Sequence, residues 1–246
     1  MQSVADKSEW KLPTGEIVRF PRGLRQDTAL RLVRPGGRLL DVGCGRGAVA
    51  SLLSERFDEV HGVDADEEAL ATAAERGVGV ARADLDREPL PFADGYFDAV
   101  VSLDVIEHVL DSATFVRELA RVLRPGGKVY LATPNVRFLG YLRTLLLKGR
   151  FPLTSSDPRG CQGGHIHFFT NADLEALLRD SGFEAVAHHG SAAQSARSTI
   201  RYRLLARVLG PRLERELLMA GSFSEATRWS GPLPALVRRG SAPRAD

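Results

Sequence analysis

Short apolar runs alternate with helix-period segments along residues 38–133. Five runs rich in β-branched residues predict strands. Between them, apolar side chains recur every three or four positions, which predicts helices. Strands that alternate with helices indicate βαβ crossovers. The pattern therefore predicts a doubly wound, mostly parallel α/β sheet of the Rossmann-like kind, with helices on both faces. The expected strands are 38–43, 59–63, 78–83, 97–103 and 128–133, and the expected helices are 48–57, 67–76 and 112–123.

A sixth helix–strand unit follows at residues 170–188. Thr170 and Asp173 have the spacing of a capping box, and 184–188 is an apolar strand candidate. No convincing seventh strand is found, because the apolar pair at 236–237 is too short. We therefore expect the C-terminal third to be helical.

Three parts of the chain are expected. Residues 1–30 form a leader or lid, 31–190 form the core with a substrate-side insertion at 135–169, and 191–246 form a basic helical extension. Basic amphipathic stretches at 138–148 and 200–209 supply helical lid elements. Such stretches cover a substrate site, pack as core, or lie on a membrane surface, and the sequence leaves these alternatives open.

Composition narrows the class of protein. The chain has 246 residues, of which 43% are hydrophobic and 26% charged, which excludes disordered and collagen-like chains. Its two cysteines cannot make a disulfide framework, and no apolar run reaches about 18 residues. We therefore expect a cytoplasmic protein without stable membrane insertion. A net charge of +2 does not indicate nucleic acid as a partner.

A glycine-rich turn follows the first strand at Gly43, Gly45 and Gly47. Glycine permits a tight turn and lets a ligand approach the backbone. The spacing of Gly43, Gly45 and Ala48, with Asp64 further on, also satisfies the dinucleotide-binding pattern. The turn alone therefore does not identify the ligand.

An acid stands at or beside the end of each of the first four strands: Asp41, Asp64, Asp84 and Asp104. These ends share one edge of a parallel sheet, where ligands bind. A pyrophosphate about 4 Å from Asp41 would be repelled by roughly 4 kcal/mol at an effective dielectric near 20. The ammonium, sulfonium, ribose diol and adenine amine of S-adenosylmethionine suit carboxylates better. The alternative for each acid is a helix N-cap.

Residues 39–135 resemble the class I S-adenosylmethionine-dependent methyltransferases, small-molecule branch. The resemblance rests on LDVGCGRG, VHGVDAD, ARADL, LPFADGYFDAVVSLDVIEHV and RELARVLRPGGKVYLATPN, with GGHIHFFTNADLEALLRDSGFE after them. Within that family the chain looks most like quinone-biosynthesis-type O-methyltransferases and methionine-biosynthesis-associated relatives. The family's usual terminal antiparallel hairpin is the feature that we do not find.

The resemblance implies a donor site for S-adenosylmethionine. Asp41 would steer the ammonium, Asp64 would hold the ribose hydroxyls, and Asp84 would accept from the adenine amine. The remaining implied contacts are Gly43, Cys44 and Gly45 with the methionine and ribose, Ala65 and Leu85 with the adenine, and Leu103 and Asp104 with the methionine end.

His108 is the candidate general base, because imidazole titrates near neutral pH and His108 follows the fourth strand closely. A divalent metal is an alternative that we do not assign. Asp104, Glu107 and His108 match an acid-x-x-Glu-His pattern of metal-using relatives, and His165 or His167 would complete the set. Since His165 and His167 alternate as on a strand, at most one points at the site.

These features predict methyl transfer from S-adenosylmethionine to a small molecule, at a hydroxyl oxygen. Two alternatives stay open: a non-catalytic donor-binding partner of another enzyme, and an NAD-dependent oxidoreductase. We expect no nucleic-acid substrate, since the chain has no lysine-rich patch with interleaved aromatics. A homodimer and the identity of the acceptor are left open. The leader side chains Trp10, Arg19, Phe20, Arg22 and Arg25 are candidates for a lid over an acidic or aromatic substrate.

Overall fold

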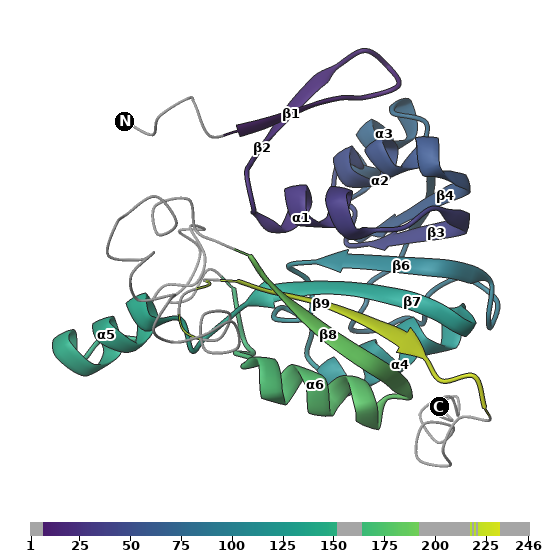
Figure 1. Cartoon of the computed structure of the whole chain (residues 1–246). Coiled ribbons are helices and arrows are strands. Elements are labelled where there is room, and N and C mark those ends of the chain that lie inside the picture. The colour runs from purple at the N-terminus through teal and green to yellow at the C-terminus, as the bar shows by residue number, and fades with distance from the viewer. Residues whose placement is uncertain (1–6, 152–163, 192–216, 218, 220, 232–246) are drawn as a thin grey trace.

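A seven-stranded sheet organises the computed structural model, which describes residues 7–151, 164–191, 217, 219 and 221–231 (Figure 1). The strand order is β5-β4-β3-β6-β7-β9-β8, and only β9 runs against its neighbours. The predicted mostly parallel α/β sheet is confirmed. The strands are β3 (Gly36–Val42), β4 (Phe57–Asp64), β5 (Gly79–Arg82), β6 (Phe97–Leu103), β7 (Leu123–Pro134), β8 (Phe183–Ser191) and β9 (Gly221–Arg228).

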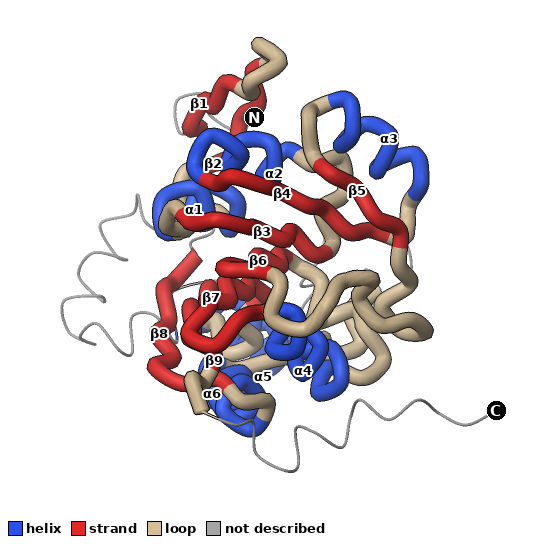
Figure 2. Tube along the Cα trace, turned by 90° about the vertical axis from the view of Figure 1, so that its right-hand side faces the viewer, coloured by secondary structure: helices blue, strands red, loops and turns tan. Residues whose placement is uncertain are grey.

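Helices cover both faces of this sheet (Figure 2). One face carries α1 (Arg25–Leu32), α2 (Ala48–Leu53) and α3 (Glu67–Glu75), and the other carries α4 (Ser112–Val122) and α6 (Asn171–Asp180). Each layer encloses its own apolar core. Leu39, on β3, is fully buried against the first layer, and Leu40, the next residue, is fully buried against the second. Side chains alternate across a strand, so one continuous apolar run serves both cores.

The helix ends follow the expected chemistry. Thr170 and Asp173 form a complete capping box at α6, as predicted. Gly182 follows that helix with φ of 94°, the left-handed conformation common after a C-cap.

The expectation that the sheet lacks a seventh strand is wrong. Residues 221–228 form β9, which lies between β7 and β8 and pairs antiparallel with both. Part of the expected helical extension is therefore an internal strand of the sheet. The remainder of 192–246, including the amphipathic stretch at 200–209, lies outside the described residues except for positions 217, 219 and 229–231.

The leader forms a two-stranded hairpin, β1 (Lys7–Lys11) and β2 (Ile17–Pro21), followed by α1. The turn of this hairpin contacts the helix layer of α1, α2 and α3 through Glu16. The carboxylate of Glu16 accepts hydrogen bonds of 2.8–3.0 Å from the guanidinium of Arg76. Arg76 also donates to the carbonyl of Arg46 at 2.6 Å. One arginine thus connects the leader hairpin to the glycine-rich turn.

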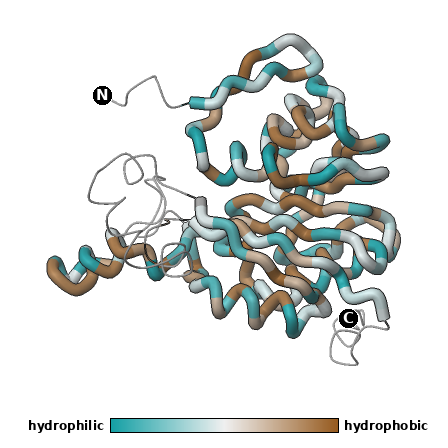
Figure 3. The backbone as a smooth tube through the Cα atoms, in the orientation of Figure 1, coloured by the Kyte–Doolittle hydropathy of each residue, from teal (hydrophilic) through white to brown (hydrophobic). Residues whose placement is uncertain are grey.

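Helix α5 (Leu139–Lys148) departs from the rest of the fold. It stands away from the sheet in Figure 1 and has no buried residue. The alternative that this amphipathic stretch packs as core is therefore wrong. In Figure 3 it is a largely apolar segment at the edge of the molecule.

Candidate functional site

The glycine-rich turn joins β3 to α2 and holds three glycines with positive φ, namely Gly43 at 73°, Gly45 at 51° and Gly47 at 70°. Residues that have a side chain rarely adopt this backbone conformation. A Cβ on Gly43 would lie 2.3 Å from Cγ2 of Val105, whereas a Cβ on Gly45 would meet no described heavy atom within 4 Å. Gly43 is therefore needed for packing, and the backbone at Gly45 is open to a ligand.

Asp64 ends β4 beside this turn. Its Oδ2 accepts a 2.8 Å hydrogen bond from the amide of Gly45, and its Oδ1 accepts one of 3.0 Å from the amide of Asp66. The carboxylate is thereby held in one orientation, and its remaining lone pairs are free to accept hydroxyl donors. Ala65, the next residue, is exposed at the same edge.

Asp41 lies behind the turn and is almost fully buried. Burial, and to a lesser extent the nearby charge of Asp64, raises the pKa of Asp41 to about 7, against a hydrogen bond from the Ala50 amide that lowers it. Burial together with Asp41 and Asp64 also raises the pKa of Cys44 to about 12. Cys44 is therefore a neutral thiol at this site and no nucleophile.

Asp84 and Leu85 follow β5, next to the end of β4. The amide of Ala83 donates to the carbonyl of Asp64 at 3.2 Å, which fixes the two strand ends together. Asp84 opens a turn, accepts from the amide of Asp86 at 3.1 Å and lies 3.4 Å from Arg87. The structure thus brings Asp64, Ala65, Asp84 and Leu85 to neighbouring strand ends, as the sequence predicts.

Acids other than those at the strand ends cap helices α3 and α4. Asp66 caps α3 and Asp111 caps α4, each two or more residues beyond the strand-end acid. Asp64, Asp84 and Asp104 cap none of the described helices. Asp41 accepts a hydrogen bond from the amide of Ala50 in the first turn of α2, so this residue has a structural role.

Asp104 follows Leu103 at the end of β6 with a φ of 61°, which is rare for a residue with a side chain. Its carboxylate forms an ion pair with Nε of Arg25, the first residue of α1, at 2.5 Å. Burial raises the pKa of Asp104, and Arg25 opposes that rise. The leader therefore reaches the edge of the sheet where β6 ends.

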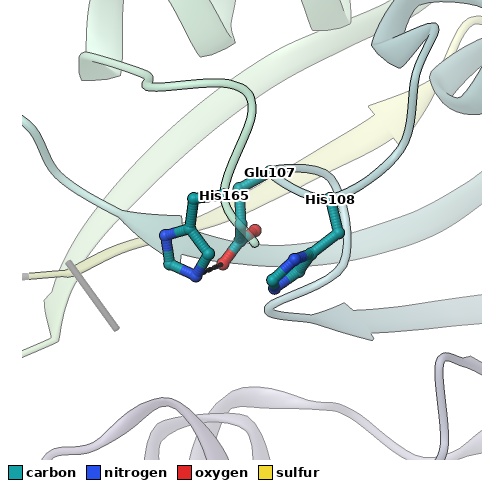
Figure 4. A group of neighbouring side chains, drawn as sticks. All are labelled: Glu107, His108 and His165. Carbon is teal, nitrogen blue, oxygen red and sulfur yellow. Dashed lines mark ion pairs between the residues drawn. The ribbon is translucent and has the colours of Figure 1, made fainter. Parts of the chain in front are cut away.

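Glu107, His108 and His165 gather just beyond Asp104 (Figure 4). One ligand atom from each lies within 4.8 Å of the others, and the two imidazole rings meet edge to face with centroids 4.6 Å apart. His108 is exposed and its Nδ1 lies 3.2 Å from the carbonyl of Gly164. The segment carrying His165 is held there by Ile166, whose amide donates to the carbonyl of Glu107 at 2.9 Å.

Burial sets the charge states in this group. Glu107 is 1% exposed, and burial together with Asp104 raises its pKa to about 8, while Thr133 donates to Oε2 at 3.0 Å. Burial, with His108 and Arg25 nearby, lowers the pKa of His165 to about 4. Near neutral pH both groups are therefore mainly uncharged, and the pair at 3.9 Å is not an ion pair then.

The expectation that at most one of His165 and His167 points at the site is confirmed, although residues 165–168 form no strand. His165 joins Glu107 and His108, whereas Nε2 of His167 lies 3.3 Å from the carbonyl of Leu110. In the metal hypothesis, Asp104 is replaced by His165, since Asp104 already pairs with Arg25.

The contacts of Thr133 with Glu107 and of Arg25 with Asp104 were not predicted from the sequence. Thr133 near the end of β7 carries no sequence signal beyond its place in a strand. Arg25 was a lid candidate, and its pairing with Asp104 across 79 residues has no local signature.

Comparison with known proteins gives the family. Residues 18–188 match the family described as methyltransferase domain, which is well over half of the chain. This chain belongs to the class I S-adenosylmethionine-dependent methyltransferases. The predicted family, the Rossmann-like fold and the donor S-adenosylmethionine are thereby confirmed.

Several methyltransferases are similar to the chain. The ubiquinone biosynthesis O-methyltransferase of Pseudomonas paraeruginosa is 34% identical over 154 residues, covering 61% of this chain and 65% of the relative. A Mycobacterium tuberculosis protein named a probable S-adenosylmethionine-dependent methyltransferase is 39% identical over 154 residues, covering 62% and 50%. These matches span less than two thirds of the relatives' own length.

A solved methyltransferase has the same fold. The S-adenosylmethionine-dependent methyltransferase of Mesorhizobium loti is 26% identical, with a TM-score of 0.58, covering 84% of this chain and 99% of its own. The methyltransferase fold therefore accounts for most of this chain.

Proposed function

We propose that this methyltransferase transfers a methyl group from S-adenosylmethionine to a hydroxyl oxygen of a small molecule. The observation that carries the proposal is the position of the Glu107–His108–His165 group. Glu107 and His108 follow Asp104 on the loop after β6, at the same sheet edge as Gly45 and Asp64, and His165 joins them from the segment before α6. A donor held at Gly45 and Asp64 would therefore have a proton acceptor within a few residues of its methionine end.

The donor fits the residues present. Gly45 offers a backbone without a neighbouring side chain, and the oriented carboxylate of Asp64 suits the two ribose hydroxyls. We assign Asp41, Gly43, Cys44 and Gly45 to the methionine and ribose part, Ala65, Asp84 and Leu85 to the adenine, and Leu103 and Asp104 to the methionine end.

Arg25 is a further donor-site residue in this proposal. Its Nε pairs with Asp104, and its two terminal amino groups have no partner among the described residues. The amino-acid end of the donor carries one carboxylate and one ammonium, and the Arg25–Asp104 pair offers a partner for each.

His108 is the proposed general base. If its Nδ1–H donates to the carbonyl of Gly164, its Nε2 is the atom that accepts the proton of the hydroxyl. When bound, the donor supplies an electrophilic methyl group. The chain's own task is to align the acceptor oxygen with it and to remove the proton, which typically contributes 10²–10⁴-fold in rate.

A divalent cation is the second candidate for activating the hydroxyl. Glu107, His108 and His165 supply one carboxylate oxygen and two imidazoles, a ligand set that suits Zn²⁺, Fe²⁺ or Mn²⁺. A bound cation would lower the pKa of the acceptor hydroxyl. Loss of turnover on chelation, and recovery on adding one of these ions, would favour the metal over His108 acting alone.

Donor binding is tested by isothermal titration with S-adenosylhomocysteine. We expect micromolar binding that Asp64→Ala weakens at least about 100-fold, because two hydroxyl bonds to a charged group are lost. Asp58→Ala is the matched control, since Asp58 is an exposed acid near the other end of the same strand. No binding by the native protein at millimolar ligand, or equal loss in both variants, would contradict the donor site.

Turnover is tested with 3,4-dihydroxybenzoate, a simple catechol, as probe. His108→Ala should lower the rate of S-adenosylhomocysteine formation by about 10²–10⁴-fold with donor affinity unchanged. His167→Ala, on the neighbouring segment, should leave both unchanged. Donor binding without turnover on any hydroxyl probe would favour the non-catalytic partner instead. Binding of NAD in place of the donor would favour the oxidoreductase.

Further assignments complete the proposal. None of the described helices is long and apolar enough to cross a membrane. We place the protein in the cytoplasm, where its described cysteine, Cys44, stays a free thiol. Residues 1–30 act as a lid on the core of 31–190, to which residues 221–228 contribute a strand.

A further inference from the structure

Helix α5 presents an unusual apolar surface. None of its residues is buried, and Leu146 and Leu147 are 80% and 78% exposed. Leu139 and Leu145 on the helix, and Phe151 just after it, are also exposed. Exposed leucines concentrated on one short helix mark an interaction site more often than single exposed residues do.

Four of the five leucines of α5 are exposed, namely Leu139, Leu145, Leu146 and Leu147, whereas Leu142 and Thr144 are partly buried. Tyr141 is partly buried, and burial raises its pKa while Arg25 lies close enough to oppose the rise. Thr144 donates to the carbonyl of Gly140 within the helix at 2.9 Å. The exposed leucines can therefore contact another surface, since α5 itself projects away from the sheet in Figure 1.

The charge around this surface is of one sign. Arg143, Lys148 and Arg150 lie in or directly after α5, and residues 135–151 contain no Asp or Glu. A second copy of α5 would bring further positive charge against these cations. The stretch at 200–209 of this chain, with Arg201, Arg203 and Arg207, would do the same. Charge complementarity thus selects an anionic surface as the occupant.

We propose that α5 docks this protein on an anionic lipid bilayer. The leucines would enter the acyl boundary, and the cations would reach the lipid phosphates, as for amphipathic helices that lie in a membrane interface. With ten residues α5 is suited to lie on a bilayer and too short to cross it. The proposal does not depend on methyl transfer.

The docked surface leads toward the Glu107–His108–His165 group. Phe151 and Phe168 meet with ring centroids 4.9 Å apart, which connects the chain after α5 to the segment that carries His165. Ile166 on that segment is 48% exposed and its amide bonds the carbonyl of Glu107. Docking would therefore bring the mouth of the site close to the lipid surface.

Flotation of the full chain with vesicles tests the proposal. We expect binding to phosphatidylcholine vesicles with about 30% phosphatidylglycerol, at least tenfold weaker binding without the anionic lipid, and weakening by salt. The double variant Leu146→Glu/Leu147→Glu should bind at least about tenfold more weakly, because charged residues replace those that enter the lipid. Arg143→Gln/Lys148→Gln/Arg150→Gln should weaken binding to a similar extent.

Ile17→Glu is the matched control, since Ile17 is 52% exposed on the leader hairpin, far from α5 in the fold. It should bind vesicles as the native protein does. Every variant should keep the native affinity for S-adenosylhomocysteine, which shows that it is folded. If the native protein does not bind this ligand, the thermal unfolding midpoint serves as the control for folding and should equal that of the native protein.

Three results would overturn the proposal. The first is the absence of flotation with anionic vesicles. If the protein then binds poly-glutamate through α5, the partner of this helix is an acidic protein and not a bilayer. The second is flotation that the α5 variants leave unchanged. The third is a dimer in light scattering that Leu146→Glu/Leu147→Glu dissociates without any effect on vesicles.

Discussion

At the scale of single residues, burial makes ordinary acids into groups that titrate near neutral pH. Asp41 and Glu107 lie at the same sheet edge, with pKa values raised to about 7 and about 8. A cationic ligand arriving there would favour their charged forms. The edge is therefore electrostatically suited to a positively charged donor.

Asp41 should make the free protein less stable as the pH rises. Its pKa is about 7 when folded and 3.8 as the reference for the unfolded chain, so between these values the folded state holds a proton that the unfolded state releases. The free energy of unfolding therefore falls across this window, by at most about 4 kcal/mol. Asp41→Asn should remove this part of the pH dependence.

Urea unfolding between pH 4 and 8 measures the effect as the difference between native protein and Asp41→Asn. Glu107 and His165 contribute their own pH dependence, which cancels in that difference. Asp58→Asn, at an exposed acid, should leave the native slope intact. A slope shared by Asp41→Asn and the native protein would show that Asp41 is ionised in the folded state.

At the scale of elements, the glycine-rich turn separates packing from binding. Gly43→Ala should cost several kcal/mol, because its Cβ would overlap Val105 and the left-handed conformation adds strain. Gly45→Ala should cost only about 1–2 kcal/mol of strain. Yet Gly45→Ala should weaken S-adenosylhomocysteine binding at least about tenfold, because its methyl group enters the space left for the donor.

Denaturant unfolding and isothermal titration on the same samples distinguish the two effects. Gly77→Ala is a control with the same positive φ and open surroundings, beyond the end of α3. It should share the modest strain of Gly45→Ala and keep native donor affinity. Equal donor affinity in Gly45→Ala and Gly77→Ala would argue against a ligand at Gly45.

Strand β9 shows why one element escaped prediction. Its sequence, GSFSEATR, consists mostly of small and polar residues, so neither an apolar run nor an apolar alternation appears. Ser222 and Ser224 are nonetheless buried, because β9 is internal to the sheet and neighbouring strands cover it. Strand propensity here reflects position in the sheet, which the local sequence does not contain.

At the scale of the whole molecule, β9 makes a distant part of the chain essential to the core. Phe223 is fully buried with Tyr130 and Leu39 in the same apolar cluster. Phe223→Ala should therefore lower the free energy of unfolding by about 3–5 kcal/mol. Trp229→Ala is the control: Trp229 directly follows β9 and is 47% exposed, so the cost should stay within about 1 kcal/mol. Urea midpoints compare them, and equal losses would mean that β9 does not belong to the core.

Much of the molecule was predictable because its signals are local. Strands β3 to β7 and the helices α2, α3 and α4 between them follow from hydrophobic periodicity, and parallel topology then puts Asp41, Asp64, Asp84 and Asp104 at one edge. Which partner each acid takes was not predictable. Asp104 pairs with Arg25 and Glu107 bonds Thr133, contacts between residues 79 and 26 positions apart in the chain.

The sequence by itself determined the fold class, the glycine-rich turn, the row of strand-end acids and the family resemblance. All four are carried by short contiguous segments whose spacing suffices. Only the tertiary structure decided that His165 and not His167 joins Glu107 and His108, that β9 completes the sheet, and that four of the leucines of α5 are exposed. These outcomes depend on burial and on contacts between distant segments, and both exist only once the chain has folded.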